Sequence, residues 1–181
     1  MKNLFSCVLM VVILFSFTIA KDPKFIGVKK CSMCHKSAKQ GEQLKIWEAS
    51  SHANAFKTLQ TPEADNIAAD KGIEGKAAEA AECLKCHVTG HGMDAVMFNK
   101  GFKMEDGVQC ETCHGAGSEY KSMKIMKDHA KSVAAGMKDY TVEGAAEAQC
   151  KTCHNEESPT YKTFVFEEQW AKIAHPIPEK K

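Results

Sequence analysis

Cys31-Ser32-Met33-Cys34-His35 is the first of four Cys-x-x-Cys-His motifs, and these motifs decide how the chain folds. The other three are Cys83-Leu84-Lys85-Cys86-His87, Cys110-Glu111-Thr112-Cys113-His114 and Cys150-Lys151-Thr152-Cys153-His154. Each motif is typical of a c-type haem attachment site, where two thiols bond to the porphyrin and the adjacent histidine ligates the iron. The sequence therefore predicts four covalently bound haem c groups, with iron ligands at His35, His87, His114 and His154.

The eight motif cysteines have two alternative uses. In an exported chain they could form four disulfides, and paired Cys-x-x-Cys units could bind zinc. Neither alternative explains why a histidine follows the second cysteine of every pair. The ninth cysteine, Cys7, lies outside the motifs in the first twenty residues. The haem interpretation is therefore preferred.

The first twenty residues have the pattern of a signal peptide. Lys2 is basic, the stretch from Leu4 to Ile19 is almost wholly apolar, and Thr18-Ile19-Ala20 is a small-x-small cleavage site. We expect residues 1–20 to be removed and residues 21–181 to form one tetrahaem cytochrome c domain in the periplasm. No later stretch is long and apolar enough to span a bilayer, so no membrane span is expected after cleavage.

Composition limits the fold class and the partners. The mature chain offers only about 40 residues per haem, so much of its interior must be porphyrin. This predicts a mainly α, haem-wrapped multihaem cytochrome c with short helices and much irregular backbone. Without Lys2 the chain has 23 lysines against 23 acidic residues, and it has no arginine. No basic cluster with interleaved aromatics indicates nucleic acid; the lysines near the motifs suit haem propionates or an acidic redox partner.

The histidine count matches one distal ligand per haem. Of eight histidines, four lie outside the motifs: His52, His91, His129 and His175. Bis-histidine ligation leaves no open iron position and favours outer-sphere electron transfer over substrate chemistry. His91 follows His87 by four residues, at most about 14 Å of chain, so it should serve a different haem or none. Methionine is the alternative sixth ligand, although methionines more often fill gaps.

Apolar spacing and breaker residues predict several short helices. We expect a helix that begins at Thr61-Pro62 and ends near Gly72, with Pro62 at its first position. The further expected helices span residues 38–49, 51–59, 76–86, 118–130, 144–153 and 167–174. Trp47 is expected to cover the surface near His52, and Trp170 the surface near His175.

Three segments together resemble the cytochrome c-554 family of tetrahaem cytochromes. They are Trp47-Glu48-Ala49-Ser50-Ser51-His52-Ala53, a W-x-x-S-x-H pattern; Cys83-Leu84-Lys85-Cys86-His87-Val88-Thr89-Gly90; and Gly107-Val108-Gln109 with the third motif and Gly115-Ala116-Gly117. The match extends roughly from Cys31 to Pro176. The resemblance implies a mainly α-helical fold with closely stacked haems, and a periplasmic carrier that takes electrons from a redox enzyme and passes them on.

The resemblance also implies a set of distal ligands. His52 would ligate the haem of His114, His129 the haem of His154, and His91 the haem of His35. The second haem, on His87, is five-coordinate in the best-known member, and His175 could close it here. In this family an aromatic residue is expected more often than histidine at the position of His91, and a local variation is the alternative interpretation of His91.

Three functions follow from these patterns. The leading one is an electron-transfer carrier between redox proteins, with no catalytic residues of its own. The second is a haem enzyme that reduces a small molecule such as nitric oxide at a five-coordinate haem. The third is a haem-stacked filament subunit, which would take a distal histidine from its neighbour.

Overall fold

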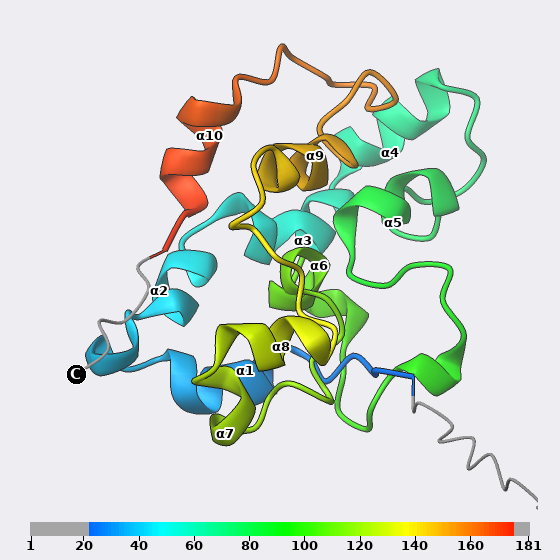
Figure 1. The fold of residues 1–181 in the computed structure, drawn as a ribbon. Coiled ribbons are helices and arrows are strands. Elements are labelled where there is room, and N and C mark those ends of the chain that lie inside the picture. Colours follow the sequence, from blue (N-terminus) through cyan, green and yellow to red (C-terminus); the bar gives the residue numbers. More distant parts are fainter. Residues whose placement is uncertain (1–21, 176–181) are drawn as a thin grey trace, which may run out of the picture.

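The computed structural model describes residues 22–175, so the expected signal peptide lies outside the described residues. Within this range the chain forms short helices joined by turns and irregular backbone (Figure 1). The α-helices are α1 (Val28–His35), α2 (Gln43–Glu48), α3 (Ala55–Leu59), α4 (Pro62–Asp70), α5 (Ala81–His87), α6 (Cys110–His114), α7 (Met123–Met126), α8 (His129–Ala134), α9 (Ala145–Lys151) and α10 (Phe166–Ile173). The 3-10 helices are η1 (Ala38–Gln40), η2 (Ser51–Asn54), η3 (Ala95–Met97) and η4 (Met104–Asp106).

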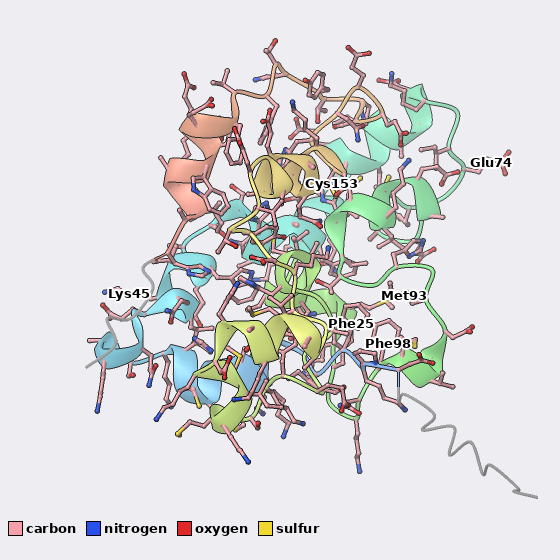
Figure 2. All side chains as sticks on the ribbon, in the orientation of Figure 1. Phe25, Lys45, Glu74, Met93, Phe98 and Cys153 are labelled. Carbon is pink, nitrogen blue, oxygen red and sulfur yellow. The ribbon has the colours of Figure 1, made fainter. Side chains whose placement is uncertain are left out.

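The mainly α prediction is confirmed. In the described part of the chain, β pairing is limited to one isolated parallel bridge between Phe25 and Phe98, two residues that lie side by side in Figure 2. Their ring centroids are 5.6 Å apart, and the bridge anchors the extended segment that leads into α1. Among the same residues, no helix has the length and apolar character needed to cross a bilayer.

The side-chain core is small, as expected for a chain that wraps cofactors. Its main cluster joins α3, α4 and the segment before α5, and its buried members are Leu59, Ala64, Ala68 and Ala77. Three of these four side chains are alanine methyl groups, which bury little apolar area each. Side-chain packing alone therefore gives these helices modest stabilisation.

Helix α4 confirms the prediction made from Thr61-Pro62. The Thr61 side chain accepts a hydrogen bond from the backbone N–H of Ala64 at 3.2 Å, and Pro62 occupies the first turn. This cap satisfies one of the four N–H groups that have no partner within a helix. The helix ends at Asp70, close to the expected end near Gly72.

Three expected helices are wrong in extent. The helix expected over residues 38–49 is the 3-10 turn η1 followed by α2, because Gly41 and Glu42 between them have positive φ. The helix expected over residues 76–86 begins only at Ala81, because Ala80 is extended and the Asp65 carboxylate holds the preceding turn through the Ala77 N–H at 2.9 Å. The single helix expected over residues 118–130 is two short helices, α7 and α8. Asp128 separates them, since its extended backbone and side-chain bond to the Lys131 N–H start a new helix.

The helices are arranged around α3 and α6. Figure 1 shows these two in the middle, with α1, α7 and α8 below them and α4, α9 and α10 above. The His52 carbonyl, just before α3, accepts the Val108 N–H, just before α6, at 3.1 Å. The central pair thus joins the segment after the first motif to the third motif.

Candidate haem centre

All four motifs lie on a helix or its last turn. The first three end helices α1, α5 and α6 at their histidines, and the fourth continues α9 through a bond from the His154 N–H to the Cys150 carbonyl at 3.0 Å. Residues three apart on a helix lie on one face, so the two thiols of each motif can reach one porphyrin edge. Within residues 22–175 all eight motif cysteines are free thiols, and no cluster suited to a bare metal ion is found.

The first motif lies against the third. The thiol of Cys31 is in hydrogen-bonding contact with that of Cys110, and this contact is the main reason that the pKa of Cys31 is raised. The same contact lowers the pKa of Cys110. Two motifs separated by about 80 residues of chain are therefore neighbours in space.

The fourth motif lies between the second and the third. Burial raises the pKa of Cys86 to about 11, and the neighbouring Cys153 thiol adds to the effect. Burial likewise raises the pKa of Cys113 to about 11, with Cys150 as the next cause. Neighbouring motifs therefore run from the first to the third, from the third to the fourth, and from the fourth to the second. Between the third and fourth motifs, Lys138 donates to both the Thr112 carbonyl and the Gln149 side chain.

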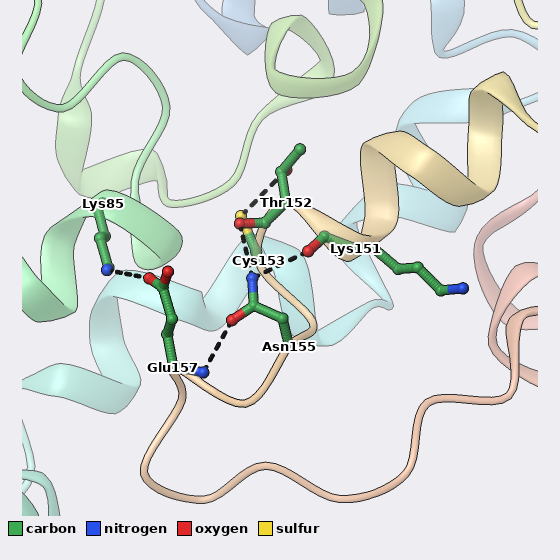
Figure 3. Close-up of polar contacts among 6 residues, drawn as sticks. All are labelled: Lys85, Lys151, Thr152, Cys153, Asn155 and Glu157. Atoms are coloured by element: carbon green, nitrogen blue, oxygen red, sulfur yellow. Dashed lines mark hydrogen bonds and ion pairs between the residues drawn. The ribbon is translucent and has the colours of Figure 1, made fainter.

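Polar contacts fix the fourth motif beside the second (Figure 3). Lys85, inside the second motif, donates to the Glu157 carboxylate at 2.5 Å. Asn155 holds the intervening turn: its side-chain amide donates to the Lys151 carbonyl at 2.9 Å, and its side-chain oxygen accepts the Glu157 N–H at 2.9 Å. The exposed ion pair contributes little by itself, so the turn geometry sets the position.

His52 lies beside the histidine of the fourth motif. The ring centroids of His52 and His154 are 6.1 Å apart, with an interplanar angle of 59°. Burial lowers the pKa of His52, and His154 adds to the effect. Phe164 stacks on the His154 ring at 4.9 Å. The resemblance had implied a partnership of His52 with His114, and the geometry favours His154 instead.

His175 lies beside the histidine of the third motif. The centroids of His175 and His114 are 5.7 Å apart. Burial lowers the pKa of His114 to about 4, and His175 and His35 are the next causes. The first-motif histidine is thus also part of this neighbourhood. Sequence reasoning had placed His175 at the haem of His87; the geometry favours His114.

The other two motif histidines are oriented through one ring nitrogen. The His87 Nδ1 lies 2.8 Å from the Ala55 carbonyl oxygen, and the His35 Nδ1 lies 3.2 Å from Gln43 Oε1. A histidine that donates from Nδ1 leaves Nε2 free to ligate a metal, and the partner fixes the ring orientation. Both contacts are compatible with an iron ligand at Nε2.

His129 and His91 occupy different surroundings. The His129 Nε2 lies 3.1 Å from Asp139 Oδ1, and its side chain is 49% exposed. His91 is half-buried in the turn after the second motif. Among the described residues, no ring contact joins either of them to a motif histidine. The structure therefore brings together two of the four expected distal histidines with motif partners.

Trp47 takes the position expected of it. Its indole N–H donates to the Val108 carbonyl at 2.7 Å, and the Val108 N–H bonds to the His52 carbonyl. Trp170 is more exposed and stacks on Phe166, with ring centroids 5.6 Å apart. The Trp47 bond supports the backbone of His52, a role that side-chain spacing alone does not reveal.

Sequence reasoning missed Glu111, which occupies a variable position of the third motif. Its carboxylate is only 2% exposed and accepts N–H groups from Ile26, Gly27 and Gly117. Desolvation raises the pKa of Glu111, against the opposite effect of these N–H groups. No local signal marks this residue, because the x positions of such motifs carry no general requirement.

The described residues fit a c-type haem on two counts. Each cysteine pair is free and shares one helix face, and two imidazole pairs have the spacing that a metal between them needs. A metal–nitrogen distance of about 2 Å separates two ligating nitrogens on opposite sides of a metal by about 4 Å. Each ring centroid lies nearly one bond length beyond its nitrogen, which adds to the separation at both ends. Centroid distances of 6.1 Å and 5.7 Å agree with this requirement.

Comparisons with known proteins identify related c-type cytochromes. The family model for cytochrome c554 and c-prime matches residues 30–115. Cytochrome c-554 of Nitrosomonas europaea is 32% identical over 173 residues, which cover 85% of this chain and 69% of that protein. The solved structure of reduced cytochrome c554 from the same organism matches with a TM-score of 0.55 at 26% identity, and the match covers 82% of each chain. The chain therefore belongs to the cytochrome c-554 family of c-type cytochromes, which implies covalently bound haem c and a role in electron transfer.

Proposed function

We propose that this protein is an exported tetrahaem electron carrier of the periplasm, formed by residues 21–181, that passes electrons between redox partners. The observation that carries the proposal is the pairing of His52 with His154 and of His175 with His114 at ligand spacing. Four Cys-x-x-Cys-His motifs provide four attachment sites. Haem supplies an iron that changes its redox state, and the chain sets where each iron lies and what ligates it.

The chain's own residues hold each haem in a defined way. The attachment cysteines are the eight motif thiols, and the motif histidines ligate from one side. On the other side we assign His52 to the haem of His154 and His175 to the haem of His114. His91 and His129 remain for the haems of His35 and His87. The resemblance pairs His91 with the haem of His35, which leaves His129 for the haem of His87. Two imidazole ligands on an iron leave no position for a substrate.

The order of the motifs supports a conducting role. Hydrogen bonds link the first motif to the third, the third to the fourth, and the fourth to the second. Cofactors attached at neighbouring thiols are held close to each other by the fold. A continuous series of this kind favours electron passage through the protein over chemistry at an isolated site.

An intact-mass measurement combined with optical spectra in both redox states tests the proposal. We expect four haems per chain, cleavage after Ala20, and low-spin spectra that do not change when nitric oxide or cyanide is added. A colourless protein with the mass of the bare polypeptide would contradict the proposal outright. A high-spin ferric band that shifts with nitric oxide would instead favour the enzyme alternative, and a polymer on size-exclusion chromatography would favour the filament.

A further inference from the structure

A groove of about 620 Å³ lies between α1, α2 and the segment of residues 100–106. The groove does not lie on the side of α1 that carries the two thiols and the histidine of the first motif. On an α-helix successive residues turn by about 100°, so Cys31, Cys34 and His35 share one side of α1. The α1 residues that line the groove include Lys29 and Met33, which lie on the opposite side. The groove is therefore centred on the face of α1 opposite the first haem site, and only Val28, at the start of the helix, lies on the side of His35. The helix between them has a diameter of about 10 Å.

The rim of the groove is basic. Its ammonium groups belong to Lys29, Lys30, Lys100 and Lys103, against the two carboxylates of Glu48 and Asp106. All four lysines are exposed, and among residues 22–175 none of them forms an ion pair. The whole chain carries a net charge of only +1. This face therefore concentrates positive charge that the rest of the molecule offsets.

The floor of the groove is apolar. Ile26, Val28, Leu44 and Trp47 line it, and the Met33 side chain at its edge is 65% exposed. The Trp47 indole N–H is already bonded to the Val108 carbonyl, so the ring presents its apolar surface. An apolar centre with a charged rim is the usual anatomy of a protein–protein contact, and exposed methionine adapts to differently shaped partners.

We propose that this groove docks a carboxylate-rich surface of a redox partner protein, and that electrons cross α1 at this point to or from the first haem. The inference rests on the proposed function for the identity of the partner as a redox protein. The argument for an acidic partner is charge complementarity with four unpaired lysines, because such complementarity steers encounters and selects partners. The apolar floor then provides the short-range contact that orients the complex.

Binding of the holoprotein to immobilised poly-L-glutamate tests the docking surface. The groove variant replaces Lys29, Lys30, Lys100 and Lys103 with glutamine. The control variant replaces four exposed lysines outside the groove with glutamine, at Lys39, Lys71, Lys124 and Lys162, so both variants lose the same net charge. At low ionic strength we expect affinity to fall about tenfold in the groove variant and less than about twofold in the control.

Equal losses in the two variants would overturn the proposal, because they would show a response to net charge alone. Unchanged binding in the groove variant would overturn it too. Wild-type protein that binds vesicles containing phosphatidylserine but not poly-L-glutamate would point to a membrane surface instead. Intact mass gives the haem count on the same samples, so a failure of docking can be told apart from a failure of the haem assignment.

Rapid reduction by flavin semiquinones tests the electron path. Flavin mononucleotide is anionic and lumiflavin is neutral, so a basic entry surface should favour the first. We expect the groove variant to slow reduction by flavin mononucleotide about tenfold at low salt, the lower end of the range for electrostatic steering, with no change for lumiflavin. Reduction potentials should stay unchanged. Shifted potentials with intact poly-L-glutamate binding would mean that these lysines pair with propionates, and would overturn the docking role.

Discussion

The carboxylate of Glu111 accepts the backbone N–H of Gly27 at 2.7 Å, across 84 residues of sequence. Its oxygens also accept the N–H of Ile26 at 2.9 Å and that of Gly117 at 2.7 Å. One buried side chain of the third motif thus joins the start of α1, which carries the first motif, to the segment that follows the third motif. The contact between Cys31 and Cys110 lies next to this connection.

Replacement of Glu111 with glutamine should destabilise the holoprotein. An amide NH₂ cannot accept an N–H, so at least one buried backbone donor loses its partner, at a cost of about 1–3 kcal/mol. A denaturant titration followed by haem absorbance measures the change. Glu105→Gln is the matched control, because Glu105 is exposed on η4. Equal stability of the two variants would contradict the role given to Glu111.

Sequence reasoning reached the features that are encoded locally. The spacing within the motifs and the start of a helix at Thr61-Pro62 both depend on residues close together in the chain. The partners of His52 and His175 do not. They are set by the bond between His52 and Val108 and by the approach of the last segment to α6, which involve residues far apart in sequence. Glu111 was missed for the same reason.

His52→Ala should convert one haem to a high-spin state while all haems stay attached. The motif thiols are unaffected, so the haem count by mass should equal that of the wild type. Because His52 faces His154 at 6.1 Å, the high-spin signal should respond to Phe164→Leu, which removes the ring stacked on His154. An unchanged spectrum in His52→Ala would remove His52 from the ligands.

The double replacement of Cys110 and Cys113 with alanine should lower the haem count by one. Both thioether bonds of the third site are lost, and the remaining motifs keep theirs. The loss should also disturb the first site, because Cys31 packs against Cys110. Mass spectrometry gives the count, and a count equal to that of the wild type would contradict the attachment scheme. Replacement of Cys7 by alanine is the control, since it lies in the expected leader.

Gly107→Ala should destabilise the protein and disturb His52 together. Gly107 has a φ of +75°, which L side chains rarely adopt, and a Cβ there would lie 2.8 Å from the His52 carbonyl oxygen. That oxygen is backbone and is held by the Val108 N–H, so it cannot move aside without shifting the 3-10 turn that carries His52.

Gly144→Ala is the comparison variant, because it has a positive φ without a collision of the new Cβ. Gly144 has a φ of +76°, but a Cβ there meets nothing within 4 Å, so this variant carries backbone strain without the collision. Strain of this kind costs about 1–3 kcal/mol, and Gly107→Ala should exceed the cost of Gly144→Ala. The Gly107 variant should also show a high-spin fraction at the same haem as His52→Ala, and the Gly144 variant none. If both glycine variants lose equal stability and keep the wild-type spectrum, the backbone contact between Gly107 and His52 does not position the ligand.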